Sequence, residues 1–191
     1  MRGFIHLLLA AALTLALNPS AIGDATQGEK QAHSLPAHVH GNAQLQLVLE
    51  ADQLLLALHS PAMNLLGFEH DVHGPEQLAM VESTRAKLAK ANTLFLFTGG
   101  ECVLNQQSLD LSAILTAEKS AHPSHQQENN SHSDIEATYQ YTCLKPNDLQ
   151  TITLMLHTVF PSIEFLQVQW IIRNRQGAAT LNDKHNEIHF R

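Results

Sequence analysis

The sequence predicts an α+β fold: a single domain of mostly antiparallel β-sheet with one or two helices, one disulfide and a disordered histidine-rich insert. Three observations lead to this class. Several short segments alternate between apolar and polar residues, which is the period of half-buried strands. One stretch has the spacing of an amphipathic helix, and the chain contains just two cysteines. The length is sufficient for one substantial hydrophobic core.

The first 23 residues have the pattern of a secretory signal peptide. A single arginine precedes an apolar run, residues 7–17, that is too short to cross a bilayer, and small residues follow up to Gly23. A signal anchor is the alternative, but Pro19 ends the apolar run early. We expect residues 1–23 to be removed and the protein to be exported to the periplasm, with no later segment that spans a membrane.

The rest of the chain divides into a leader and one domain. Residues 24–36 are small and polar without periodicity, which is typical of a flexible leader. Residues 37–191 form the domain, and within it the segment of about 112–134 lacks aromatic residues and almost lacks apolar ones. We expect this segment to be a disordered loop. It carries His122, His125 and His132.

The charge of the chain excludes one class of partner. The formal net charge is -7, and it becomes -8 once Arg2 leaves with the signal peptide. An acidic protein is a poor nucleic-acid binder, so we expect no nucleic-acid partner. Its surface attracts cations weakly. Thirteen histidines in 191 residues indicate more directly which cations matter.

The alternating segments give the expected order of elements. Leucines at every second position from Gln44 to Glu50, and again from Leu54 to Leu58, predict a hairpin. Pro75 is suited to the first turn of a helix ending near Ala91, whose apolar stripe would contain Leu78, Val81, Arg85, Leu88 and Ala89. Further strands are expected over residues 93–97, 137–144 and 163–173, with a turn at Gln176-Gly177, short strands at 179–181 and 187–190, and either strand or helix over 149–160.

Cys102 and Cys143 are the only cysteines. In an exported protein we expect them to form a disulfide, which would close a loop of about forty residues and add roughly 4 kcal/mol to stability. A thiolate pair binding a metal is the alternative. It is less favoured because such ligands usually occur as close pairs and must stay reduced.

His38 and His40 form the first candidate metal-binding group. If the first strand continued back through them, both side chains would project from its polar face, one pleat apart. Gly41 can instead carry a bulge that changes this facing. In either case two imidazoles lie close enough in sequence to bind one ion.

A second group contains Glu69, His70 and His73 beside Asp71. Zinc takes imidazole nitrogen and carboxylate oxygen in a four-coordinate shell, so His38, His40 and His70 are the expected ligands. The fourth position would go to Glu69, His73, His59 or water. Solvated or buried histidines of no functional role are the alternative for single cases such as His33 and His157.

Enzyme signatures are missing from the sequence. It contains no metalloprotease helix motif, no hydrolase nucleophile elbow and no phosphate-binding glycine loop. We therefore expect no catalytic activity. Three alternatives remain: a metal-dependent hydrolase with Glu69 as base, an exported copper or nickel buffer, and a structural module for adhesion or assembly whose histidines are incidental. Ligand type does not separate zinc from other divalent transition metals.

Several motifs together carry a family resemblance. They are His38-Val39-His40-Gly41, the string Ser60-Pro61-Ala62-Met63-Asn64-Leu65-Leu66-Gly67-Phe68-Glu69-His70, Cys102, the histidine-rich insert, Tyr139-Gln140-Tyr141-Thr142-Cys143, Phe160-Pro161-Ser162-Ile163-Glu164 and Val168-Gln169-Trp170. With these motifs the chain resembles the ZrgA-type zinc-uptake proteins over essentially its whole mature length.

The resemblance implies a Gram-negative periplasmic protein that binds zinc and supports its import through inner-membrane components. Carried over to this chain, it implies His38, His40 and the Glu69-His70 pair as the site, with the insert histidines as an accessory capture segment. The chain departs from the pattern after His70, where Asp71-Val72-His73 replaces an expected Ala-Pro. His73 is thus either an additional ligand or a surface substitution.

Overall fold

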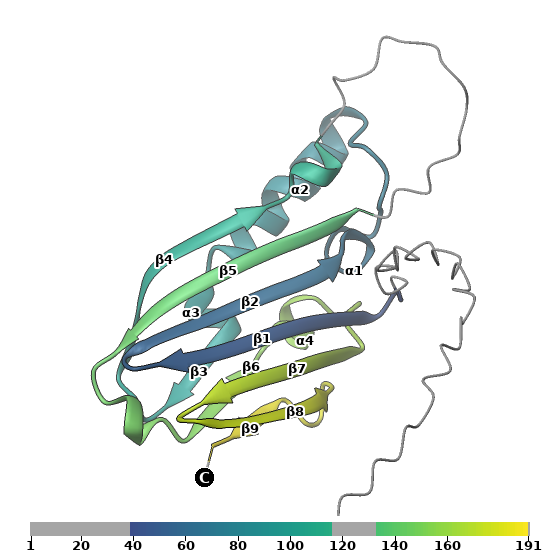
Figure 1. The fold of residues 1–191 in the computed structure, drawn as a ribbon. Helices are drawn as coiled ribbons and strands as arrows, with labels where there is room; N and C mark the ends of the chain where they lie inside the picture. The colour runs from purple at the N-terminus through teal and green to yellow at the C-terminus, as the bar shows by residue number, and fades with distance from the viewer. Residues whose placement is uncertain (1–38, 116–132, 191) are drawn as a thin grey trace, which may run out of the picture. The chain divides into compact units, whose positions relative to one another are not determined.

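Two β-sheets make up the fold of the computed structural model, which describes residues 39–115 and 133–190. The larger sheet has six strands in the order β4-β5-β2-β1-β7-β8, and the smaller has three in the order β3-β6-β9 (Figure 1). The described part of the chain is one domain of mostly antiparallel sheet with few helices, as the sequence predicts. The expected signal peptide, the leader and most of the insert lie outside the described residues.

The elements follow one another with short connections. The larger sheet contains β1 (Asn42–Glu50), β2 (Gln53–Pro61), β4 (Cys102–Asp110), β5 (Asp134–Cys143), β7 (Phe165–Ile172) and β8 (Arg175–Leu181). The smaller sheet contains β3 (Phe95–Thr98), β6 (Thr151–Leu154) and β9 (Glu187–His189). The helices are α1 (Ala62–Leu66), α2 (Gly74–Leu88), α3 (Ala91–Leu94) and α4 (Leu156–Val159), with 3-10 turns at Ser112–Ile114 and Pro146–Asp148.

The predicted hairpin of β1 and β2 is confirmed. A two-residue turn joins the strands, and their register places Leu47 opposite Leu56. Leucines at alternate positions of both strands are buried, because each pleat turns them toward the same face of the sheet. This face is the inner surface of the larger sheet.

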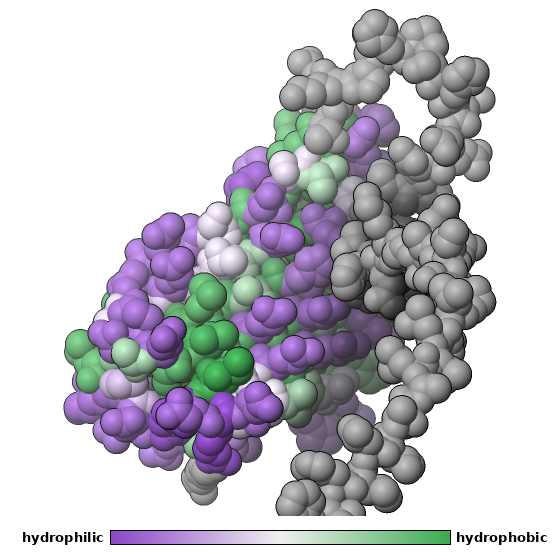
Figure 2. Space-filling view, in the orientation of Figure 1, coloured by the Kyte–Doolittle hydropathy of each residue, from purple (hydrophilic) through white to green (hydrophobic). Residues whose placement is uncertain are grey.

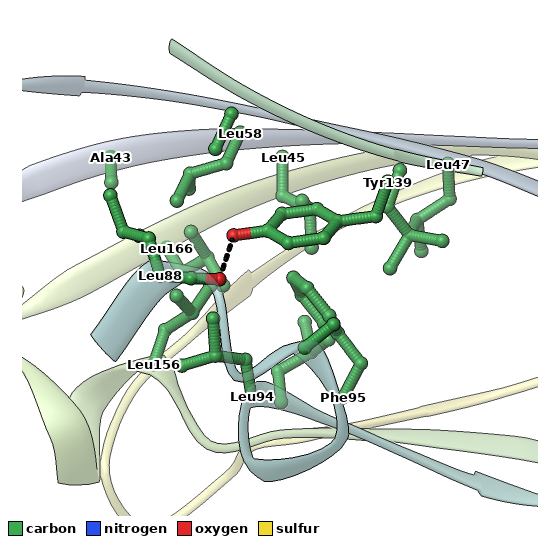
Figure 3. Packing of buried hydrophobic residues seen from close by; sticks show 14 of the residues in the cluster. Ala43, Leu45, Leu47, Leu58, Leu88, Leu94, Phe95, Tyr139, Leu156 and Leu166 are labelled. Atoms are coloured by element: carbon green, nitrogen blue, oxygen red, sulfur yellow. Dashed lines mark hydrogen bonds between the residues drawn. The ribbon is translucent and has the colours of Figure 1, made fainter. Parts of the chain in front are cut away.

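The core lies between the inner face of the larger sheet and the layer formed by α2, α3, α4 and the smaller sheet (Figure 1). Tyr139 and Tyr141 of β5 are the largest fully buried side chains, and Figure 3 shows the packing around Tyr139. Its hydroxyl donates a hydrogen bond of 2.9 Å to the carbonyl oxygen of Leu88, and its ring packs edge to face on Phe95 at 4.9 Å. Burial raises the pKa of Tyr139, so the hydroxyl stays a neutral donor.

One strand pair departs from the antiparallel pattern. β7 lies beside β1 in parallel, with Leu45 opposite Val168, while the other strand pairs of both sheets are antiparallel. Parallel neighbours need a long crossover connection, and here everything from β2 to α4 lies between them in sequence. The pairing brings the start of β7 beside the start of β1.

The outer face of the larger sheet is mostly polar. Glutamines of β1 and β7 stand side by side in register on it, as Gln44 with Gln167 and Gln46 with Gln169. Figure 2 shows hydrophilic residues over most of this face and a hydrophobic patch near one end. Leu55 and Ile171 flank Val48 across three neighbouring strands of this sheet.

The predicted helix is confirmed as α2, but its predicted stripe is partly wrong. Val81 and Leu88 are buried as expected, whereas Leu78 is exposed. Thr84 takes a buried position instead and donates a hydrogen bond to the carbonyl oxygen of Leu65. A threonine hydroxyl paired in this way is compatible with burial, which apolar periodicity alone does not reveal.

Three local expectations need correction. The last hairpin turns at Arg173-Asn174, which have φ values of 53° and 60°, and Gln176-Gly177 lie within β8. The strand β4, which begins at Cys102 and has nine residues, was not predicted. The polar residues in its centre interrupt the alternation of apolar and polar positions. Residues 149–160, expected to form either a strand or a helix, contain the strand β6 followed by the helix α4.

The disulfide between Cys102 and Cys143 is confirmed. The two residues face one another in the register of β4 and β5, so the bond joins neighbouring strands. The alternative of a thiolate metal site is therefore wrong for this structure. Within the described ranges, no helix is long and apolar enough to cross a membrane.

Candidate metal centre

His40 lies in a tight turn that leads into β1. The N–H of Asn42 donates to the carbonyl oxygen of Val39 at 3.0 Å, and Gly41 has a φ of 83°. This left-handed conformation favours glycine, and it ends the strand register before His40. The conditional expectation of a strand running back through His40 is therefore wrong. The direction of the His40 side chain is therefore set by this turn and not by the pleat of β1.

A buried asparagine holds this turn in place. Asn64 of α1 accepts a hydrogen bond of 2.8 Å from the N–H of Gly41 through Oδ1. Its Nδ2 donates to the carbonyl oxygen of Asn42 at 2.8 Å and to Ser60 Oγ at 3.3 Å. One side-chain amide thus satisfies two successive backbone groups, the N–H of Gly41 and the carbonyl oxygen of Asn42, and so holds the turn that carries His40.

The carbonyl oxygen of Gly41 links the turn to β7. It accepts hydrogen bonds from the N–H groups of Glu164 and Phe165, at 2.7 and 2.9 Å. Phe165 is the first residue of β7, which runs parallel to β1, and Glu164 directly precedes it. The turn is therefore held from two directions, by α1 and by the chain entering β7.

The loop that carries Glu69 and His70 is anchored at both ends. Gly67 ends α1 in the left-handed conformation, and its N–H donates to the carbonyl oxygen of Met63. Phe68 is buried, and the N–H of Val72 donates to the carbonyl oxygen of Ile114 at 3.0 Å. Between these anchors the chain presents Glu69 to the β1 turn.

His40 and Glu69 meet directly. His40 Nε2 lies 3.0 Å from Glu69 Oε1, although 29 residues separate the two in sequence. The exposed fraction is 53% for the His40 side chain and 15% for that of Glu69. The carboxylate is thus largely enclosed, while the imidazole is open to solvent on one side.

His70 and His73 form a ring stack with Phe68. The centroids are 5.0 Å apart between Phe68 and His70, and 5.6 Å apart between His70 and His73. His70 Nδ1 lies 2.8 Å from the carbonyl oxygen of Asp71. Because a carbonyl only accepts, Nδ1 carries a hydrogen, and in the neutral ring Nε2 then keeps the lone pair with which an imidazole binds a metal.

His59 belongs to a different pair. It projects from β2, where Glu136 is its neighbour across the strand pair, and its Nε2 lies 3.2 Å from Asp134 Oδ2. His157 of α4 is buried, as expected for a core histidine, and desolvation lowers its pKa. His59 therefore has a carboxylate beside it, whereas both ring nitrogens of His157 are buried without a hydrogen-bond partner among the described residues.

The other expected site residues lie outside the described residues. They are His38, His33 and the insert histidines His122, His125 and His132. Among residues 39–115 and 133–190, no three His, Cys, Asp or Glu side chains converge as a metal shell. The described chain therefore supplies a preformed pair, His40 with Glu69, and places His70 next to it in sequence.

The geometry of this pair can be tested against zinc. Two ligand atoms at about 2.05 Å from zinc, at the tetrahedral angle, lie about 3.3 Å apart. The observed separation of 3.0 Å is close to this value, and binding would also require the hydrogen between the two atoms to leave. One imidazole nitrogen and one carboxylate oxygen are also donors that zinc prefers. The pair thus offers two donor atoms of the kinds that zinc binds, and further ligands would have to complete a four-coordinate shell.

The comparison with protein families now decides the family. A family model described as "ZrgA family zinc uptake protein" matches residues 37–190.

The chain belongs to the ZrgA family.

Family membership confirms the resemblance drawn from the sequence motifs and gives the protein a role in zinc uptake. Comparison with curated proteins found no match. The match begins just before His40 and continues to the end of β9, so the turn, α1 and the Glu69 loop all lie within it.

Asn64 is the residue that the sequence analysis missed as part of the site. Its signal was present: a single amide within the apolar string Ala62-Met63-Asn64-Leu65-Leu66. A polar residue on the buried side of a helix requires hydrogen-bond partners, and here they are the backbone groups of the histidine turn.

Proposed function

We propose that this ZrgA-family protein captures zinc in the periplasm at a centre built on His40 and Glu69, and passes it to inner-membrane import components. The observation that carries the proposal is the 3.0 Å contact between His40 Nε2 and Glu69 Oε1. It joins two zinc-type donors from distant parts of the chain. Family membership supports zinc as the ion.

His38 and His70 complete the centre in this proposal. His38 lies two residues before His40 in the chain, and His70 follows Glu69 directly. The hydrogen bond from His70 Nδ1 to the Asp71 carbonyl leaves Nε2 ready to bind. His73, stacked on His70, or a water serves as a further ligand when one of these is displaced. We place His59 outside the centre because it pairs with Asp134.

Release matters as much as capture for an uptake protein. A shell completed partly by the exposed His40 leaves one side of the ion accessible to a competing ligand. The insert histidines, His122, His125 and His132, act in our proposal as weak accessory ligands that raise the local zinc concentration. The acidic net charge of the chain assists by attracting cations. No catalysis is part of this function.

A zinc titration with two variants tests the proposal. Removal of a ligand from a four-coordinate site should weaken affinity strongly, so we expect His40→Ala to raise the Kd by about a hundredfold. Glu69→Gln keeps the shape but loses the charge, and we expect a rise of about tenfold to a hundredfold. The measurement is competition with a chromophoric chelator on the purified, disulfide-bonded protein.

A histidine–glutamate pair elsewhere in the fold provides a matched control. His189 Nε2 lies 3.6 Å from Glu187 Oε2 in β9, so His189→Ala removes a similarly exposed histidine from beside a glutamate. We expect the control to leave the Kd unchanged. If the zinc affinity is unaffected by His40→Ala but is lost when residues 118–133 are deleted, the insert is the binding site and the proposed centre is wrong.

A further inference from the structure

Strand β8 forms a long open edge of the larger sheet. It is the last strand beyond β7 in the sheet order, and Figure 1 shows it at the lower border of that sheet. Its residues pair with β7 on one side. In the part of the chain that the structure describes, no backbone hydrogen bond joins β8 to another segment. Such an edge is a template for a further strand.

The hairpin turn shows which backbone groups face outward. A two-residue turn, Arg173-Asn174, makes the flanking residues Ile172 and Arg175 a hydrogen-bonded pair. Hydrogen-bonded and non-hydrogen-bonded pairs then alternate along the strands. Gln176, Ala178 and Thr180 therefore direct their N–H and C=O groups away from β7, toward the open edge.

The other sheet edges in the described ranges carry features that hinder strand addition. β4 contains a register shift between Leu104 and Gln106, and such bulges disrupt an edge. β3 has four residues and β9 has three. β8 has seven residues in uninterrupted register, with no proline and no charge after Arg175. It is the edge best suited to bind another strand.

We propose that β8 pairs with β8 of a second copy of this chain, antiparallel around a two-fold axis at Ala179. This register places Ala178 opposite Thr180, so outward-facing backbone groups of both copies bond to one another. Small side chains at the axis allow the strands to approach. The two six-stranded sheets then continue into one another, which is a self-complementary contact that closes at a dimer.

The charges at the ends of β8 favour this arrangement over other occupants. Arg175 stands at the start of the strand, and Asp183 is exposed in the bend just after its end. Antiparallel pairing about Ala179 brings Arg175 of each copy beside Asp183 of the other. Parallel pairing in register would set Arg175 beside Arg175, which is repulsive. An unrelated extended peptide would match the backbone but not both charges.

Backbone donors at the edge give the first test. Ala178→Pro removes an outward N–H without removing a bond to β7, so the monomer should fold. Ala178→Ser changes the same side chain but keeps the N–H. We expect sedimentation equilibrium up to about 0.2 mM protein to show dimers for the wild type and for Ala178→Ser, and monomers for Ala178→Pro. Thermal unfolding checks that each variant is folded.

Charge reversal gives a second test that does not depend on the proline variant. Arg175→Asp alone and Asp183→Arg alone each place like charges together at both ends, and we expect the dimer Kd to rise about tenfold or more. Mixing the two variants restores opposite charges at both ends, so dimers should return. A wild type that stays monomeric overturns the proposal, as does a dimer that none of these variants weakens.

Discussion

Replacing Asn64 with leucine is expected to lower the free energy of unfolding by about 3 kcal/mol. We expect the same replacement to weaken zinc binding. Leucine is close in volume but offers neither donor nor acceptor. The N–H of Gly41 loses the acceptor 2.8 Å away, and the carbonyl oxygen of Asn42 loses its donor. Buried backbone groups without partners are costly, and the turn that carries His40 loses its support.

Urea unfolding and zinc titration measure the two effects on the same sample. Asn92→Leu is the control, because Asn92 is exposed in α3 and its replacement should change stability by less than about 0.5 kcal/mol. Asn64→Asp is a second variant: it can still accept from Gly41 but cannot donate to Asn42 when ionised. An Asn64→Leu protein with unchanged stability and zinc affinity would show that the amide does not hold the turn.

Loss of the disulfide is expected to destabilise the protein by about 4 kcal/mol. The bond joins residues 41 positions apart, and that loop includes the histidine-rich insert. A disulfide lowers the conformational entropy of the unfolded chain, and this effect grows with the length of the loop that it closes. A cross-link around a long insert should therefore stabilise the folded state strongly. Replacing Cys102 and Cys143 together by alanine leaves no free thiol to exchange or to bind metal.

Reduction provides the matched control for this prediction. A reductant should destabilise the wild type by about as much as the double replacement does, and should leave the alanine variant unchanged. Zinc affinity of the folded protein should be retained. Cys143 donates its N–H to the carbonyl oxygen of Asp52 in the β1–β2 turn, at the opposite end of these strands from His40. A large loss of affinity would implicate the cysteines in metal binding.

Local patterns were sufficient for much of the fold. Alternation identified β1, β2 and β7, since their inner faces are almost uniformly apolar. It missed β4, where Asn105, Gln106 and Gln107 interrupt the pattern beside a bulge. The parallel pairing of β1 with β7 was also beyond reach, because contacts between strands so distant in sequence leave no mark in either strand alone.

The candidate site, like the fold, could be predicted only in part from the sequence. His40, Glu69 and His70 could be named from residue type and spacing, because zinc ligands come from few residue types. Their relative positions depend on Gly41 and Asn64, and therefore on tertiary contacts between the turn and α1. His38 and the insert histidines stay predictions, as they lie outside the described residues.

Anomalous diffraction at the zinc absorption edge, from crystals of the zinc-loaded protein, is the most direct test of the proposed centre. We expect a single strong peak at about 2.0–2.2 Å from both His40 Nε2 and a carboxylate oxygen of Glu69, with further imidazole nitrogens completing the shell. A zinc peak elsewhere, with His40 and Glu69 still 3.0 Å apart and hydrogen-bonded to one another, would contradict the proposed site.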